Sequence, residues 1–171
     1  MAGQIGRLIG RALFGGAKAA GKVGAKAGKN IGKQVGKTNK YGQRVFKRQI
    51  VPRQANGYES YQMTTLNHDG SVASKVNVER SYGHSHIVKE TPIQGSNARN
   101  KTEIITTKRG ADYSRPQSYD NYRSGHTLIT NSTYDPKTKT VTKETSNISW
   151  VREPETGGVN KFQEGTLRVK F

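Results

Sequence analysis

The stretch HTLITNSTYDPKTKTVTKETSNISWV, residues 126–151, decides the fold class of this chain. Its two arms, residues 126–134 and 139–151, carry many Thr, Val and Ile residues, which favour β-strands. Asp135-Pro136-Lys137-Thr138 joins the arms, and these residue types favour a tight turn. The stretch therefore predicts a β-hairpin.

A second hairpin is predicted upstream, because the chain takes on the same composition from Tyr58 onward. Residues 58–66 and 71–80 flank the turn sequence Asn67-His68-Asp69-Gly70. In the second arm, valines alternate with polar residues, as expected of a strand with one apolar face. We therefore expect strands, not helices, in this part of the chain.

Further strands complete the predicted fold. They are expected at residues 84–90, 101–108, 159–163 and 166–171, the last two forming a terminal pair. Leu167, Val169 and Phe171 alternate with polar residues and are expected to face the core. About six to eight antiparallel strands in a meander predict a mainly β domain over residues 58–171, a small sandwich or barrel. Since hydrophobic residues make up 31% of the chain, we expect a small core.

The first 58 residues differ sharply in charge from the rest. They contain no Asp or Glu but carry 13 Lys or Arg, so this third of the chain holds +13 of the formal net charge of +17. A block of one charge sign repels itself and favours an extended or partner-bound segment. We assign residues 1–57 to a basic Gly/Ala/Lys-rich N-terminal arm and connector.

Within the arm, lysines recur every three or four residues between positions 17 and 40, which would place them on one side of a helix. They are Lys18, Lys22, Lys26, Lys29, Lys33, Lys37 and Lys40. Glycines at 21, 24, 28, 32 and 36 form a neighbouring strip. Because each interior glycine costs a helix about 0.8–1 kcal/mol, we expect the arm to be helical only when a partner binds it.

Nucleic acid is the partner that the lysine spacing favours. Lysines beside phosphates release condensed counterions, which gives sequence-independent affinity that falls steeply with salt. We expect the seven lysines to contact nucleic acid together with Arg44, Lys47 and Arg48. Two alternatives remain open for the arm, namely a solvated tail and a segment that threads between protein subunits.

A membrane surface is the competing partner. Within residues 1–16, apolar side chains at Ile5, Leu8 and Leu13 follow the spacing of one helical face. With the small residues four apart that follow, residues 1–40 could lie on an anionic bilayer, so a membrane-active protein is the alternative function. We find no secretory signal and no apolar run of 18 residues, so a transmembrane helix is not expected.

No motif predicts catalysis. The chain has no cysteine, no phosphate-binding glycine loop and no nucleophile elbow. His84 and His86 share one side of a predicted strand but have no third ligand nearby, so we interpret them as exposed polar residues. A nuclease-like set of His84, Lys89, Glu90 and His126 has no supporting spacing. We expect no enzyme, metal site or cofactor.

A polar loop at residues 109–125 interleaves tyrosines with arginines. The residues are Tyr113, Tyr119, Tyr122, Arg109, Arg115 and Arg123. Such a loop is typical of protein–protein contacts, and it also resembles surfaces that stack and bind single-stranded nucleic acid. The protein-contact interpretation is preferred.

A basic arm ahead of a β-rich domain resembles the general architecture of many viral and phage structural proteins. The resemblance implies a capsid or other virion component whose arm faces packaged nucleic acid or threads between subunits, while the β domain packs into an assembly. We therefore expect a non-enzymatic structural and assembly protein, located in the virion or in the cytoplasm before assembly. Its expected partners are nucleic acid and other subunits.

Overall fold

The computed structural model describes residues 31–111, 113–114, 116–119, 121–153 and 156–171. Over these residues the chain forms nine β-strands and no helix. The strands are β1 (Lys33–Val35), β2 (Arg44–Val51), β3 (Glu59–Leu66), β4 (Val72–Arg80), β5 (His84–Pro92), β6 (Arg99–Ala111), β7 (Tyr122–Asp135), β8 (Thr140–Arg152) and β9 (Val159–Lys170).

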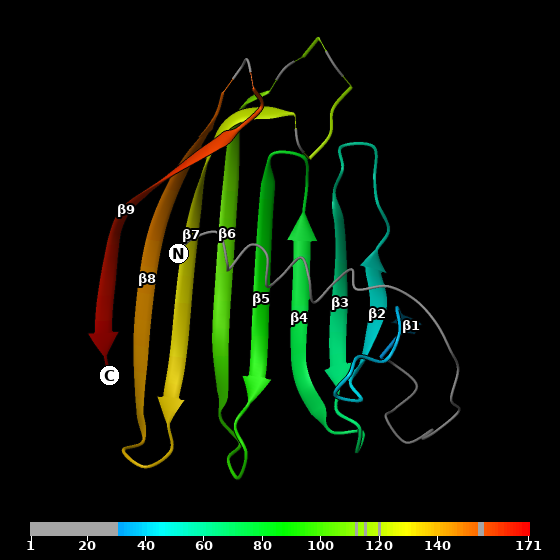
Figure 1. Ribbon diagram of the computed structural model, residues 1–171, viewed down its shortest axis with the longest axis vertical. Coiled ribbons are helices and arrows are strands. Elements are labelled where there is room, and N and C mark those ends of the chain that lie inside the picture. Colours follow the sequence, from blue (N-terminus) through cyan, green and yellow to red (C-terminus); the bar gives the residue numbers. More distant parts are fainter. Residues whose placement is uncertain (1–30, 112, 115, 120, 154–155) are drawn as a thin grey trace.

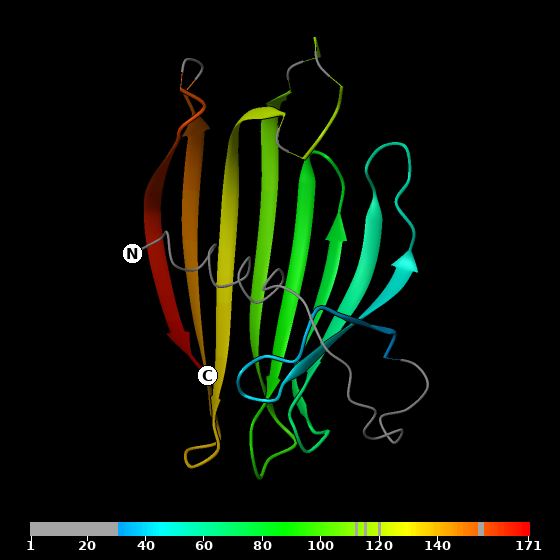
Figure 2. The ribbon, with the colours of Figure 1, turned by 45° about the vertical axis from the view of Figure 1, so that its right-hand side comes forward.

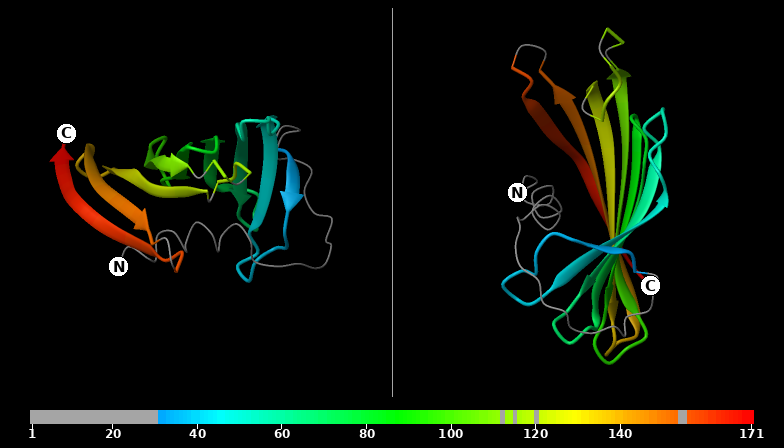
Figure 3. Two further views of the ribbon diagram at one scale, coloured as in Figure 1. Left: turned by 90° about the horizontal axis from the view of Figure 1, so that it is seen from above. Right: turned by 90° about the vertical axis from the view of Figure 1, so that its right-hand side faces the viewer.

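The strands form one open sheet in chain order, and every neighbouring pair is antiparallel (Figure 1). The views in Figure 2 and Figure 3 show that the sheet is strongly twisted and, over the described strands, one layer thick. The prediction of a mainly β, antiparallel meander is confirmed. The predicted strands at residues 84–90 and 101–108 correspond to β5 and β6.

The predicted sandwich or barrel is wrong. The described strands lie side by side in a single sheet, and β1 and β9 do not contact each other. A second layer requires a continuous apolar face, but both faces of this sheet carry hydroxyl side chains that contact one another across strands. Thr106 and Thr127 do so at 3.1 Å on one face, and Thr130 and Thr145 at 3.2 Å on the other.

Both hairpins predicted from turn sequences are confirmed. β3 and β4 flank a turn in which the Gly70 N–H donates to the Asn67 carbonyl oxygen at 3.0 Å. Gly70 has φ +85°, a conformation that glycine adopts without a steric cost. In the β7–β8 turn, the Lys137 N–H donates to the Asp135 carboxylate at 2.9 Å. Local turn chemistry therefore sets where these strands reverse.

The predicted strand pair at residues 159–163 and 166–171 is instead one strand, β9. It pairs with β8 along its length, with an irregularity in register at Asn147/Ile148, opposite Gly165. Leu167 is 67% exposed and Phe171 is 69% exposed, so these side chains do not face a core as expected. The sequence pattern identified the strand character correctly but placed a turn at a glycine where the strand is merely irregular.

The described end of the arm contains a short strand and no helix, and helicity of the arm with a bound partner stays a prediction. Residues 33–35 form β1, and the flanking Gly32 and Gly36 have φ values of +91° and +75°. A Cβ on Gly32 would lie 2.1 Å from the Lys47 carbonyl oxygen, so this glycine lets the backbone turn closely against β2. The sheet thus begins inside the segment grouped with the arm. Residues 17–30 lie outside the described residues.

A row of apolar side chains crosses the sheet and forms its core. Register pairs Tyr61 with Val78, Val78 with Ile87, Ile87 with Ile104, and Ile104 with Ile129, so all five lie on one side, which we call the Tyr61 face. All but Ile87 are buried. Met63, on the same face, forms a buried cluster with Tyr61 and Val78. The partly buried side chains that pack against this cluster are Val35, Val45, Val76 and Ile87.

This row makes a stability prediction. We expect Ile104→Ala to lower the free energy of unfolding by about 2 kcal/mol, the low end for core truncations, because a one-layer sheet surrounds the side chain incompletely. Leu167→Ala is the matched control and should change it by less than about 0.5 kcal/mol, since that side chain is exposed. Urea unfolding followed by circular dichroism measures both. Equal effects would show that the row is not a core.

Candidate functional site

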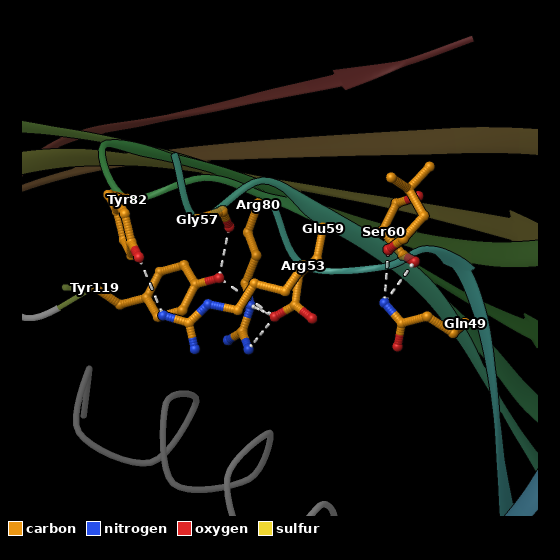
Figure 4. A network of polar contacts seen from close by, with 9 residues as sticks. Gln49, Arg53, Gly57, Glu59, Ser60, Arg80, Tyr82 and Tyr119 are labelled. Carbon is orange, nitrogen blue, oxygen red and sulfur yellow. Dashed lines mark hydrogen bonds and ion pairs between the residues drawn. The ribbon is translucent and has the colours of Figure 1, made fainter. Parts of the chain in front are cut away.

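Alternate connections of a meander lie at the same end of the sheet, and here they bring together a cluster of aromatic and cationic side chains (Figure 4). Arg53 comes from the β2–β3 connection, Tyr82 from the β4–β5 connection and Tyr119 from the β6–β7 connection. The Tyr82 and Tyr119 ring centroids are 5.3 Å apart at an interplanar angle of 58°. The Arg53 guanidinium donates to the Tyr82 hydroxyl at 3.3 Å.

Tyr119 is the centre of this cluster. Its hydroxyl donates to the Gly57 carbonyl oxygen at 2.7 Å, while its ring centroid lies 4.3 Å from the Arg80 guanidinium and 5.1 Å from that of Arg53. Cation–π contacts of this kind contribute about 0.5–2 kcal/mol each. They hold the β6–β7 connection against the Tyr61 face.

Glu59 is the buried acid of the cluster, 7% exposed. Its carboxylate accepts a hydrogen bond from Arg80 Nε at 2.7 Å. Burial opposes ionisation, but the hydrogen bond and charge of Arg80, the charge of Lys47 and the Tyr119 hydroxyl outweigh it, so the pKa of Glu59 lies below its usual value. Burial raises the pKa of Tyr119, which keeps the phenol protonated as a donor.

An open depression of about 260 Å³ adjoins the cluster. It is lined by Lys108, Tyr119, Tyr122, Thr127, Trp150, Arg152, Val159 and Lys161. The Lys108 ammonium donates to the Tyr119 carbonyl oxygen and lies 5.6 Å from the Tyr122 ring centroid. The lining combines aromatic surface with basic side chains and includes no acidic residue.

The structure places part of the predicted nucleic-acid-binding set along the β1–β2 edge of the sheet. Lys33 and Lys47 are directly opposite each other on β1 and β2. The Lys47 ammonium lies 4.0 Å from the Tyr61 ring centroid, while Arg48 alternates to the other face. Lys37 and Lys40 lie in the β1–β2 connection, and Arg44 begins β2. Lys18, Lys22, Lys26 and Lys29 lie outside the described residues.

The Tyr61 face is strongly basic over the described strands. Register and alternation place on it Lys33, Lys47, Arg80, Lys89, Lys108, Arg123, Arg152, Lys161, Arg168 and Lys170. The acids on this face are each engaged: Glu59 with Arg80, Glu144 with Arg168 at 4.0 Å, and Asp135 with the β7–β8 turn. The positive charge is therefore only partly neutralised within the chain.

The fold places the tyrosines of the polar loop at residues 109–125 in different surroundings. Tyr113 is 84% exposed, whereas Tyr119 and Tyr122 line the depression, and Arg115 lies outside the described residues. Sequence reasoning missed Arg53, Arg80 and Trp150, because nothing local links them to the loop. The signal that could have found them is the meander itself, which brings every second connection to one end.

Two histidines make polar contacts with a neighbouring strand. His86 Nε2 lies 2.7 Å from Glu103 Oε1, and the hydrogen bond from His86 lowers the pKa of Glu103. His126 Nδ1 lies 3.4 Å from the Ser149 hydroxyl. The described residues contain no group of three or more His, Cys, Asp or Glu placed to hold a metal ion. None of the described segments is a helix with the length and apolarity needed to cross a bilayer.

Comparison with known proteins found no matching family model, curated protein or solved structure.

The Glu59–Arg80 pair makes a pH prediction. Since the folded pKa of Glu59 is depressed, its contribution to stability is fully present above the unfolded value, about 4.3, and is lost as the pH falls through the folded pKa. We expect Glu59→Gln to cost about 1–2 kcal/mol at pH 7 and much less near pH 3. Urea unfolding at both pH values measures this. Glu79→Gln, at an exposed position of β4, is the control and should show a smaller change. A cost for Glu59→Gln that does not vary with pH would contradict the assignment.

Proposed function

We propose that this chain is a non-enzymatic structural subunit of a virion, which assembles through its open sheet and binds nucleic acid through its basic arm and basic face. The observation that carries the proposal is the outer edge of β9. A long, exposed edge strand offers unpaired backbone groups to another strand, and isolated proteins usually cover or interrupt such an edge.

The backbone of β9 defines which groups are offered. Phe171 and Val141 exchange both hydrogen bonds, at 2.8 and 3.1 Å, so the backbone groups of Phe171 point toward β8. Because these groups alternate in an antiparallel strand, those of Thr166, Arg168 and Lys170 point outward. They form a ladder that a further strand could continue.

Apolar side chains on β9 support the same proposal. Phe162, Leu167, Val169 and Phe171 share the face opposite the Tyr61 face, with exposures between 38% and 69%. Exposed apolar side chains that gather along one strand are typical of interaction surfaces. Another copy of this chain that pairs a strand with β9 and packs on this face would bury these side chains. Their exposure therefore favours assembly with further copies of this chain.

Charge supports the nucleic-acid part of the proposal. The arm carries +13, and the Tyr61 face presents basic side chains with few competing acids. A polyanion would neutralise the arm and the Tyr61 face. Its affinity would come from counterion release and would not depend on base sequence. The location of the chain in a virion rests on the resemblance in architecture.

The assembly proposal predicts a proline-sensitive edge. Thr166→Pro removes an outward N–H without removing a β8–β9 hydrogen bond, so it should abolish concentration-dependent association while leaving the fold intact. Thr166→Ala keeps the N–H and is the matched control. Sedimentation velocity over a concentration series measures association. A wild-type chain that stays monomeric at every concentration would contradict self-assembly through this edge.

The nucleic-acid proposal predicts a charge- and position-dependent affinity. In the full chain, replacing Lys18, Lys22, Lys26 and Lys29 by Gln should reduce the slope of log affinity against log salt by roughly 3. The matched control replaces Lys75, Lys137, Lys139 and Lys143, which lie outside the arm in the sequence, and should change the slope by less. Fluorescence anisotropy with labelled DNA and RNA measures it. Equal effects would overturn the role of the arm, and binding of anionic vesicles without binding of nucleic acid would favour the membrane-active alternative.

A further inference from the structure

The depression beside the Tyr119 cluster is lined in part by residues to which the sequence assigned no role. Lys108 comes from β6, Trp150 and Arg152 from β8, and Lys161 from β9. Register aligns Lys108 with Gly125, Gly125 with Trp150, and Trp150 with Lys161, so these residues form one row on the Tyr61 face. The row ends at the same end of the sheet as the tyrosine cluster.

Gly125 makes room for the indole of Trp150. A Cβ on Gly125 would lie 2.3 Å from Trp150 Cζ2 and 2.6 Å from Nε1, so the ring lies directly over the glycine backbone. Any other residue at this position would push the ring off the sheet. The aromatic surface is thereby held in place at the floor of the depression, with Tyr122 beside it.

The basic side chains around this ring differ in how they are engaged. Lys108 donates to the Tyr119 carbonyl oxygen. Arg152 has its Nε buried with no hydrogen-bond partner among the described residues. A buried donor without a partner costs free energy, so the Arg152 guanidinium retains hydrogen-bonding capacity that the described residues do not use. Arg152 and Lys161 line the same depression as the ring, from the neighbouring strands β8 and β9.

We infer that this depression binds one nucleotide of a single-stranded nucleic acid, with the base stacked on Trp150 and the adjoining phosphate held by Arg152 and Lys161. The inference rests on the proposed nucleic-acid binding and assigns it a second site outside the arm. A planar guanidinium binds phosphate through paired N–H donors, and any base can stack on an aromatic ring. Binding at this site therefore does not depend on the base sequence.

The size and openness of the depression favour a single strand over a duplex. Its volume of about 260 Å³ lies just below the usual range of ligand pockets, roughly 300–1,000 Å³, which suits one nucleotide. The depression is open, so a strand can enter and leave it. In a duplex the bases are stacked on each other, and the Trp150 ring would have no free base to contact.

Trp150 is the only tryptophan in the chain, so its fluorescence reports directly on this site. The experiment titrates the full chain with an oligothymidylate of about eight nucleotides, within the usual range of site sizes, and follows tryptophan emission and the anisotropy of a labelled oligonucleotide together. We expect emission to be quenched with the same saturation midpoint as the anisotropy. A duplex of equal length should raise the anisotropy without quenching.

Paired substitutions test the assignment of residues. Arg152→Gln with Lys161→Gln should raise the oligonucleotide concentration at the quenching midpoint about tenfold, as expected for loss of two phosphate contacts. Arg168→Gln with Lys170→Gln removes the same charge from the same face but away from the depression, and should shift the midpoint much less. Trp150→Leu should lower affinity in the anisotropy assay by about tenfold, because stacking is lost.

The outcomes separate this site from the function on which it rests. Oligonucleotide binding without quenching would overturn the site and leave the nucleic-acid function standing. No binding by either readout would overturn both. Equal effects of the two paired variants would show that only general charge matters and would also overturn the site. Quenching by a sulfated glycan but not by the oligonucleotide would assign the depression to a different anion and overturn the inference.

Discussion

Lateral pairing holds the described strands of this chain, because over the described residues no second layer covers either face of the sheet. Each net backbone hydrogen bond contributes only about 1 kcal/mol, so stability depends on long, in-register ladders. The longest pairing, β7 with β8, lies in the interior of the sheet. The apolar row on the Tyr61 face adds burial to these ladders, but it is too narrow to recruit another sheet.

The same constraint creates the functional surfaces. A one-layer sheet has two faces and two edges in contact with solvent, so polar, basic and aromatic side chains can gather on one face without the expense of burial inside a core. The Tyr61 face collects the basic residues, the cation–aromatic cluster and the depression over Gly125. The edge of β9 is left with unpaired backbone groups, which is where assembly with another copy would complete the ladder.

The cluster at the Tyr119 end links fold and surface. Tyr119 is held by Arg53 and Gly57 from the β2–β3 connection and by Arg80 from the end of β4. This contact fixes the β6–β7 connection against the sheet and forms one wall of the depression. The ion pair between Glu59 and Arg80 therefore has a structural role, and it also orients the guanidinium that the Tyr119 ring covers.

Residue types and turn chemistry were sufficient to predict β strands, two hairpins and the concentration of charge before residue 58, because these properties act over a few neighbouring residues. They failed at Gly165, where a local pattern fits a turn as well as an irregular strand until strand pairing selects one. The single open layer, the exposure of Leu167 and Phe171, and the meeting of Lys108, Trp150, Arg152 and Lys161 were decided by tertiary structure alone. The physical reason is that strand register, which no local segment determines, sets which distant side chains share a face.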